Sequence, residues 1–536
     1  MKIGHASSHR SLTRERGVAW LILFVAGFAL GGMYWQSLKA LLISPVTAIQ
    51  AALPAPELPT LTVNIAFTEY SNLLAQRESA QTTGAFVANE ADFQQATIEV
   101  VDENGRFQEI PVRLRLRQGT AESLGEHDKW PFDVRTRSDT TLWGMSRFTL
   151  QDPASNNWLA QWAFIQAAAR EGLLVTRYQF VNLTINGDSK GIYALQEGFS
   201  QELLTEQAHI PGVIIEFNGD RLWQTIQAQD GDEQAILADP FTHLRPVDWH
   251  LLTIDAVQDN TIENDAALLV QRETAISRLR GLQTGTETAG AIFDTAQYGT
   301  LLALADWWDA ADALSWVNLR FYYNPDTDLL EPIVASGQPL LVNGRISSAY
   351  FYNDSDVQQA YLTAVQRLTQ PDYLDQLQAD LDPQLQQLQR ALQAETDLTL
   401  PWETLRQRQT QLQQSLAPNQ PILAYFDNTH ADTLQINLAS VYNLPLQLIG
   451  FDIGGATFLQ ANPAWIQGDT SALLPGTDGA IILRPPATDT VYFVQFQIPI
   501  LEIQRLDSEL DGLTGIEINI ATQIVGLPNV QLTPAR

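Results

Sequence analysis

The chain has 536 residues, of which 45% are hydrophobic and 17% charged, and its formal net charge is −30. This length exceeds what one hydrophobic core serves, and the apolar content is too high for a disordered chain, so we expect two or three folded units. The acidity excludes nucleic acid as a partner for the bulk of the protein, and the lack of cysteine excludes disulfides, thiol catalysis and Cys-ligated zinc.

An apolar run near the N-terminus predicts a membrane anchor. Residues 18–35, VAWLILFVAGFALGGMYW, carry no charge, and extended to residue 38 the run is long enough to cross a bilayer as a single-pass helix. The tail of residues 1–17 holds four Lys or Arg side chains and one acid, so we expect it in the cytoplasm and the acidic bulk outside the cell membrane. A cleaved signal peptide is the alternative, but the run is longer than a usual signal core and no clean cleavage site follows closely.

The residues around this anchor suggest a spacer and a contact between anchors. Residues 39–60 are rich in proline, which favours a stiff linker between the anchor and the body. Gly27 and Gly31 form a GxxxG pattern, which would allow a dimer through packed anchor helices. Simple exposure of both glycines to lipid is the alternative.

The first part of the body, a predicted domain of residues 61–355, alternates between strands and single helices. Alternation in the string VRLRLR places Arg113, Arg115 and Arg117 on one face of a strand. Asn-Gly pairs at 104–105 and 186–187 favour hairpin turns. The predicted strands are 61–64, 97–101, 110–117, 132–137, 147–150, 179–185, 191–196 and 212–217, and the predicted helices are 158–171 and 201–207.

The stretch from Trp307 to Gly337 is the predicted functional junction. We expect a helix that carries acidic residues, then strands at 319–323 and 329–334 joined by a turn that begins at Asn324. Carboxylates and an amide at a helix end beside a hairpin are suited to holding a metal ion and phosphates.

The rest of the chain is predicted to be helical and then β. Residues 224–290 are acidic and mostly helical in pattern, and leucines spaced by three and four within a helical region of residues 356–420 predict a pair of helices. Gln-rich low complexity is the alternative there, but the leucine periodicity argues against it. Short alternating strands from Ile422 onward predict a β-sandwich over residues 421–536, so the fold class is α+β.

Four strings in a fixed order resemble the CotH kinase-like family, which takes its name from spore-coat proteins. They are RFTLQDP at 147–153, WLAQWAFIQAAAREGLL at 158–174, RYQFVNLTINGDSKGIYALQE at 177–197 and NLRFYYNPDTDLLEPI at 318–333. The similarity spans roughly residues 95–345. It implies an atypical protein-kinase fold with a helical insertion, and phosphorylation of Ser or Thr on envelope or secreted proteins with ATP and Mg²⁺ or Mn²⁺.

Phosphoryl transfer needs cations near the phosphates, carboxylates that hold metal, and a group that positions the attacking hydroxyl. The candidates for the phosphates are Arg115, Arg117 and Lys129, with Glu197 as partner to a cation. Asp312 and Asn318 resemble the Asp-then-Asn arrangement of a kinase catalytic loop. That resemblance implies a catalytic role and a metal-binding role for both.

The chain also departs from the family pattern. Ser336 follows the LEPI string where the family carries a metal-binding aspartate, and Val317 precedes Asn318 where a histidine is frequent. At residues 198–201 this chain reads Gly-Phe-Ser-Gln, where the family tends to have a His or Gln followed by an acid and a lysine. A hydroxyl does not supply the charge of a carboxylate to Mg²⁺, so the metal site is partly degraded. The alternatives to an active kinase are therefore a catalytically inactive scaffold for envelope proteins, or a surface protein that binds carbohydrate or wall polymer through its β domain.

Each candidate also has a purely structural interpretation. Asp306, Asp309 and Asp312 could form the solvent-exposed face of a helix, and the three strand arginines could offset neighbouring acids. Glu197 could belong to a structural ion pair. The seven histidines are scattered, which gives a histidine metal site little support.

Overall fold

The computed structural model describes most of the chain after residue 56. The chain divides after Glu57, and Leu58–Arg536 forms one compact unit. The predicted anchor at 18–38 and most of the predicted linker lie outside the described residues, and within the described part no helix is long and apolar enough to cross a membrane. The described residues are 57–101, 105–120, 124, 129–137, 140–219, 252–257, 262–340, 354–427, 432–442, 444–455, 457–474, 476, 479–486, 490–506 and 516–536.

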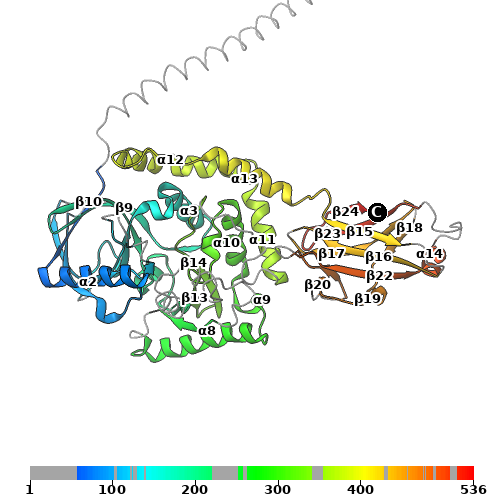
Figure 1. The fold of residues 1–536 in the computed structure, drawn as a ribbon, viewed down its shortest axis with the longest axis horizontal. Helices are drawn as coiled ribbons and strands as arrows, with labels where there is room; N and C mark the ends of the chain where they lie inside the picture. The colour runs from blue at the N-terminus through cyan, green and yellow to red at the C-terminus, as the bar shows by residue number, and fades with distance from the viewer. Residues whose placement is uncertain are drawn as a thin grey trace, which may run out of the picture. The chain divides into compact units, whose positions relative to one another are not determined.

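A closed barrel forms the first part of this unit (Figure 1). Its strands follow the order β1-β3-β4-β6-β7-β10-β9, and a parallel pairing of β1 with β9 closes it. Helix α2 (Phe67–Thr83) adds Leu73 and Ala80 to the barrel core. The strand bounds are Thr60–Ile65 for β1, Gln94–Val101 for β3, Phe107–Leu116 for β4, Phe132–Thr136 for β6, Arg147–Gln151 for β7, Tyr178–Ile185 for β9 and Asp188–Glu197 for β10.

The alternation that predicted these strands decides which side chains enter the barrel. In β4, the apolar residues Ile110, Val112 and Leu114 are buried, and Arg113 and Arg115 between them point outward. Both predicted hairpins are confirmed, since β3 pairs with β4 and β9 with β10 in antiparallel register. Positive φ angles at 186 and 187 give the second hairpin the tight turn that its Asn-Gly pair favours.

A five-stranded sheet forms the second layer, with the order β12-β11-β13-β14-β8. The predicted hairpin of β13 and β14 is confirmed, and the Asn324 side chain accepts a hydrogen bond from the backbone N–H of Asp326 at 3.0 Å. The strand bounds are Leu174–Val175 for β8, Ile214–Phe217 for β11, Ile254–Ala256 for β12, Arg320–Asn324 for β13 and Leu329–Val334 for β14. The neighbouring helices are α3 (Trp158–Arg170), α4 (Gln201–Glu206), α8 (Ala266–Thr284), α9 (Ala289–Ile292) and α10 (Thr295–Trp307).

The prediction of an acidic helix from Trp307 onward is wrong. Helix α10 ends at Trp307, and Asp309 has a φ of 53°, which breaks the helix before a short 3₁₀ helix, η5 (Ala311–Leu314). The interpretation of the aspartates as a solvent-exposed helix face is also wrong. Asp306 accepts a hydrogen bond from the Tyr361 hydroxyl at 2.7 Å, and Asp309 pairs with Arg408 at 3.2 Å.

The leucine-rich region holds three helices where the sequence predicted two. They are α11 (Ser355–Leu368), α12 (Tyr373–Leu392) and α13 (Trp402–Ser415). Within α12, most of the periodic leucines are buried, as their spacing predicted. Helix α11 packs closely on α10. A Cβ added to Gly299 of α10 would lie only 2.5 Å from the backbone of Ala360 in α11.

Two sheets make up the C-terminal part. Phe451 on one and Phe496 on the other have ring centroids 5.6 Å apart, so the inner faces share one core. The four-stranded sheet contains β15 (Ile422–Asp427), β16 (Thr433–Ser440), β22 (Phe493–Pro499) and β19 (Ile466–Gln467). The six-stranded sheet contains β20 (Leu473–Leu474), β21 (Ile481–Leu483), β17 (Leu446–Ile453), β23 (Ile518–Ile524), β24 (Val530–Pro534) and β18 (Thr457–Gln460).

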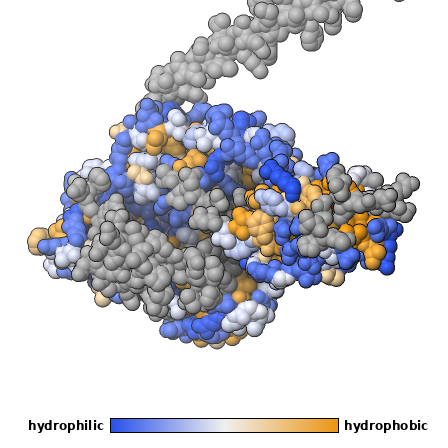
Figure 2. All heavy atoms as spheres, turned by 45° about the vertical axis from the view of Figure 1, so that its right-hand side comes forward, coloured by the Kyte–Doolittle hydropathy of each residue, from blue (hydrophilic) through white to orange (hydrophobic). Residues whose placement is uncertain are grey.

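Hydropathy varies across the described surface. Figure 2 shows wide hydrophilic areas interrupted by separate hydrophobic patches. The barrel, the two further groups of sheets and the helices together make the structure α+β, as the sequence predicted. The domain boundaries predicted within 58–536 stay predictions.

Candidate functional site

A cavity of about 250 Å³ lies between the outer face of the barrel and the start of the second sheet. Arg117, just after β4, and barrel strands β6, β7 and β10 line one side, and the segments around β13 and after β14 line the other. Its polar or charged lining residues are Arg117, Asp133, Arg135, Arg147, Thr149, Gln196, Glu197, Asn318, Arg320 and Ser336. Four of these ten are arginines, which makes the cavity cationic in a strongly acidic chain.

Three arginines stand directly opposite one another on adjacent barrel strands. Arg113 of β4 pairs in register with Arg135 of β6, which pairs in register with Arg147 of β7. We call these three residues the arginine row. Like charges directly opposite each other on a sheet repel and destabilise it. The row therefore has a cost for folding that a bound anion would remove.

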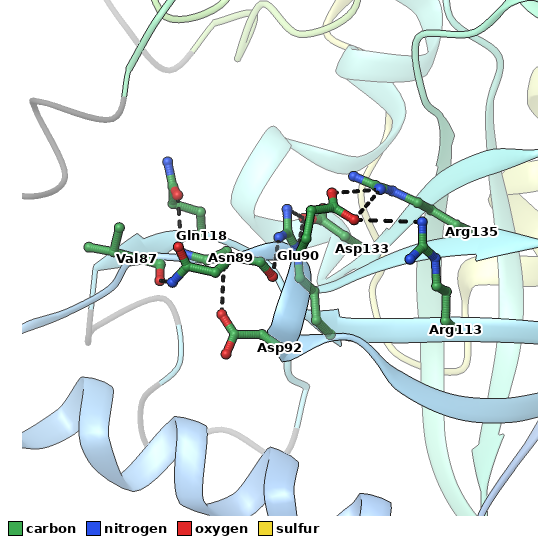
Figure 3. A network of polar contacts seen from close by, with 10 residues as sticks. Val87, Asn89, Glu90, Asp92, Arg113, Gln118, Asp133 and Arg135 are labelled. Atoms are coloured by element: carbon green, nitrogen blue, oxygen red, sulfur yellow. Dashed lines mark hydrogen bonds and ion pairs between the residues drawn. The ribbon is translucent and has the colours of Figure 1, made fainter. Parts of the chain in front are cut away.

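Glu90 partly neutralises two neighbouring members of this row, Arg113 and Arg135. It lies in η1 (Glu90–Asp92), and its carboxylate approaches Arg135 at 2.7 Å and Arg113 at 3.6 Å (Figure 3). Partial burial alone would raise the pKa of Glu90, but the nearby guanidinium of Arg135, with those of Arg113 and Arg115, lowers it overall. One carboxylate thus forms ion pairs with two cations, and it acts on the third member of the row only through its more distant charge.

Arg147 is that third member. Among the described residues its guanidinium makes no hydrogen bond or ion pair. Burial, together with the nearby Arg135 charge, lowers the pKa of Arg147 to about 10. Burial also lowers the pKa of Arg135. Arg147 is therefore a charged donor that lines the cavity and, within the described part of the chain, has only the more distant charges of Glu90 and Glu202 to offset it.

Arg117 and Arg320 reach the cavity from opposite sides. Arg117 donates to the Gln151 side chain at 2.6 Å, and Arg320 pairs with Glu216 at 2.5 Å. Burial lowers the pKa of Arg320, the Glu216 carboxylate opposes that change, and the Arg117 charge adds to it. The Arg320 Nε is buried and has no hydrogen-bond partner among the residues that the structure describes. A donor of this kind is suited to an acceptor oxygen inside the cavity.

Arg115, a predicted phosphate ligand, belongs to the wall next to the cavity. It pairs with Asp133 at 3.3 Å and donates to the backbone carbonyl of Asn89 at 2.8 Å. The guanidiniums of Arg115, Arg113 and Arg135 all lie over the ring of Phe93, at 4.5, 4.9 and 4.4 Å from its centroid. Arg115 thereby fixes Asp133, which lines the cavity.

Lys129 lies away from the cavity. Its ammonium pairs with Glu395, after α12, and donates to the backbone carbonyl of Ile192 at 2.9 Å. It also lies 5.7 Å from the centroid of the Trp158 ring. These contacts join the barrel to the helical region.

Glu197 lines the cavity and forms a bidentate ion pair with Arg177. The two side chains meet at 2.9 Å and 2.7 Å, and the Arg177 backbone N–H adds a third bond at 3.2 Å. The Glu197 side chain is 1% exposed. The cation it holds is therefore Arg177, which the sequence did not single out.

Asp312 and Asn318 lie together, as their predicted roles require. The Asn318 amide donates to the Asp312 carboxylate and to the Asp312 backbone carbonyl, both at 2.9 Å. Burial raises the pKa of Asp312, although hydrogen bonds from Asn318 and Ser315 oppose that change. Asn318 and Ser336 line the cavity, and Asp312 contacts Asn318 without being one of the lining residues.

The donor groups determine what the cavity could hold. Within the described ranges, no group of three or more His, Cys, Asp or Glu side chains is placed to hold a metal ion. The lining carboxylates Asp133 and Glu197 are paired with arginines. The residues therefore fit phosphate oxygens well and offer Mg²⁺ little beyond the Asp312–Asn318 pair and the phosphates themselves.

Sequence reasoning missed Arg135, Arg147, Arg177 and Arg320. Arg147, Arg177 and Arg320 stand inside the strings that carried the family resemblance, but no local pattern distinguishes them. Their role depends on register between strands that lie far apart in sequence. Arginines that alternate with apolar residues in two neighbouring strands were the available signal.

Comparisons with known proteins do not identify the family of this chain. No protein-family model and no curated protein matches the chain. Among solved structures, it is similar to the proinflammatory kinase CtkA of Helicobacter pylori, with 11% identity over 53% of this chain and 90% of that one and a TM-score of 0.20. A likeness this weak carries no argument, so the resemblance to CotH kinase-like proteins stays a hypothesis.

Proposed function

We propose that the cavity binds the phosphates of a nucleoside triphosphate such as ATP, in a kinase-like protein anchored in the cell membrane with its bulk outside. The observation that carries this proposal is the arginine row, which ends inside the cavity at Arg147, a guanidinium with no hydrogen bond or ion pair among the described residues. Arginine presents a planar fork of donors that matches phosphate oxygens, and such charge-assisted bonds are about twice as strong as neutral ones.

Electrostatics favours a highly charged anion over a neutral ligand. The cations of the cavity are partly desolvated, as the lowered pKa values of Arg135, Arg147 and Arg320 indicate. A bound anion compensates cations that burial has deprived of water, and the low local dielectric strengthens the attraction. The Thr149 hydroxyl, buried and without a hydrogen-bond partner among the described residues, adds a neutral donor. A triphosphate supplies enough oxygens to satisfy several arginines at once.

A second candidate function is transfer of a phosphoryl group to a Ser or Thr hydroxyl of an envelope or secreted protein. The contact between Asp312 and Asn318 favours it, because a carboxylate beside the cavity could accept the proton of an attacking hydroxyl. Mg²⁺ or Mn²⁺, held by these two residues and the phosphates, would neutralise charge on the phosphoryl group. Ser336, in place of a carboxylate, favours the alternative of an inactive scaffold that keeps only nucleotide binding.

The test separates binding from chemistry. The full-length protein in detergent is heated with ATP, with ATP and EDTA, or alone, and is also incubated with γ-labelled ATP, Mn²⁺ and its own membrane fraction. The proposal predicts a higher melting temperature with ATP both with and without EDTA. Label on protein that Asp312→Asn abolishes, with the thermal shift kept, would support phosphotransfer. An unchanged melting temperature at millimolar ATP would sink the nucleotide proposal itself.

A further inference from the structure

The outward face of the four-stranded C-terminal sheet carries side chains of a particular chemistry. Its positions alternate with the buried ones along β15, β16 and β22. Across the sheet, Tyr425 lies opposite Asn437, Asn437 opposite Gln495, and Gln495 opposite Gln467. One aromatic ring and three amides therefore form a single row, which we call the amide row.

The neighbouring rows continue the pattern. Phe493 occupies one of them, and its ring centroid is 6.2 Å from that of Tyr425. Gln435 and Gln497 occupy the other, and the Gln495 amide donates to the Gln435 carbonyl at 3.1 Å. Tyr425 and Phe493 are each 43% exposed, so their ring faces are available to a ligand. Aromatic rings thus lie beside a field of amides.

We infer that this face binds a neutral polysaccharide. Amides donate and accept hydrogen bonds, as sugar hydroxyls do, and exposed rings offer apolar surface to the C–H face of a sugar. Successive strands lie about 4.8 Å apart, so the amide row extends about 14 Å and could contact several sugars in line. This inference is independent of the nucleotide cavity.

Charge decides between kinds of polymer. Among the described outward positions of β15, β16, β22 and β19, Asp427 is the one charged side chain. The whole chain carries −30, so an anionic polymer would be repelled and would find no cation on this face. A basic partner would find few carboxylates here. A neutral glycan matches both the face and the molecule.

The test is native affinity electrophoresis of the full-length protein in detergent. Gels contain a neutral polymer (hydroxyethylcellulose, glucomannan or glycol chitin), anionic polygalacturonate, or no polymer. The inference predicts retardation in at least one neutral polymer and none in polygalacturonate. Tyr425→Ala with Phe493→Ala should weaken the apparent affinity by about tenfold or more. Gln495→Leu, which keeps both rings, should also weaken it.

The matched control is Phe458→Ala, on β18 of the other sheet. Phe458 is 46% exposed, similar to the two rings of the proposed face, and this variant should be retarded like the wild type. Unchanged mobility of the wild type in every neutral polymer would overturn the inference, as would equal retardation of wild type and double variant. Sedimentation in parallel tests the other occupant: a dimer that the double variant abolishes would assign the face to a second copy of the chain.

Discussion

Arginine side chains set the balance between stability and binding at the cavity. The row of Arg113, Arg135 and Arg147 places three positive charges on adjacent strands, and Glu90 forms ion pairs with only the first two. Sites that bind charged ligands commonly keep such unfavourable arrangements, and their removal stabilises the free protein. The opposite effects on folding and on binding make the row testable one residue at a time.

Replacing Arg147 should separate the two effects. Arg147→Gln is expected to raise the free energy of unfolding by roughly 0.5 to 1 kcal/mol, because one like-charge contact disappears. It should weaken ATP binding by roughly thirtyfold, the effect of about 2 kcal/mol for a charge-assisted bond. Arg137→Gln is the control, since Arg137 is exposed on the same part of the barrel and bonds to Gln95. Urea unfolding and calorimetry measure both quantities.

The pH dependence of this stabilisation has a defined sign. Arg147 has a pKa of about 10 in the folded chain, well below the ordinary value of an arginine, so its charge costs stability at every pH below about 10. The cost is relieved only as the pH rises above that value. The gain from Arg147→Gln should therefore be constant between about pH 6 and about pH 9. A gain that changed steeply within that range would contradict the assigned cause.

Glu197 depends on Arg177 for its burial. Arg177→Met leaves a carboxylate that is 1% exposed without its cation, and we expect a loss of about 3 to 5 kcal/mol in the free energy of unfolding. Arg177→Met combined with Glu197→Met should recover much of that loss, because no uncompensated charge remains. If the double variant unfolds as easily as the single one, packing and not charge explains the loss.

At the scale of elements, close helix packing explains one glycine. A Cβ at Gly299 of α10 would lie 2.5 Å from backbone atoms of Ala360 and Tyr361 of α11, which cannot move independently. Gly299→Ala should therefore destabilise the protein by about 1 to 3 kcal/mol, despite the helix preference of alanine.

Gly281 of α8 supplies the matched control. There the added Cβ would lie 2.6 Å from the Cγ of Glu287, a side-chain atom that rotation about χ1 can move, and not against the backbone of another helix. Gly281→Ala should therefore cost less than Gly299→Ala, within about 1 kcal/mol of the wild type, because the helix preference of alanine offsets part of the strain. Thermal unfolding of both variants checks the pair, and equal effects would refute the assigned packing of α10 against α11.

Local patterns predicted many of the elements and few of the cavity residues. Alternation and Asn-Gly turns located the barrel hairpins because both signals act within a few residues. The prediction of a helix after Trp307 failed because Asp309, which pairs with Arg408, has a left-handed backbone conformation that no local sequence pattern indicates. The number of leucine-rich helices was predicted wrongly because the leucine spacing indicates helix but does not mark where one helix ends and the next begins. Arg135 and Arg147 escaped prediction because strand register is a property of the folded sheet.

At the scale of the whole molecule, the cationic cavity stands in an acidic protein. The net charge of −30 repels anions at long range, and the arginines attract them at short range. Salt screens exposed charges over about 10 Å at 0.1 M but screens partly buried ones less. Nucleotide binding should therefore change little between about 50 and about 300 mM NaCl. A steep loss of affinity with salt would place the ligand on the exposed surface.

The most direct test of the nucleotide cavity is calorimetric titration of the full-length protein with ATP, in the presence of Mg²⁺ and again in EDTA. We predict saturable binding to one site in both conditions, because arginines and not carboxylates hold the phosphates, and at least about tenfold weaker binding by Arg147→Gln. Absence of binding at millimolar ATP, or equal binding by the wild type and the variant, would contradict the assignment of the cavity.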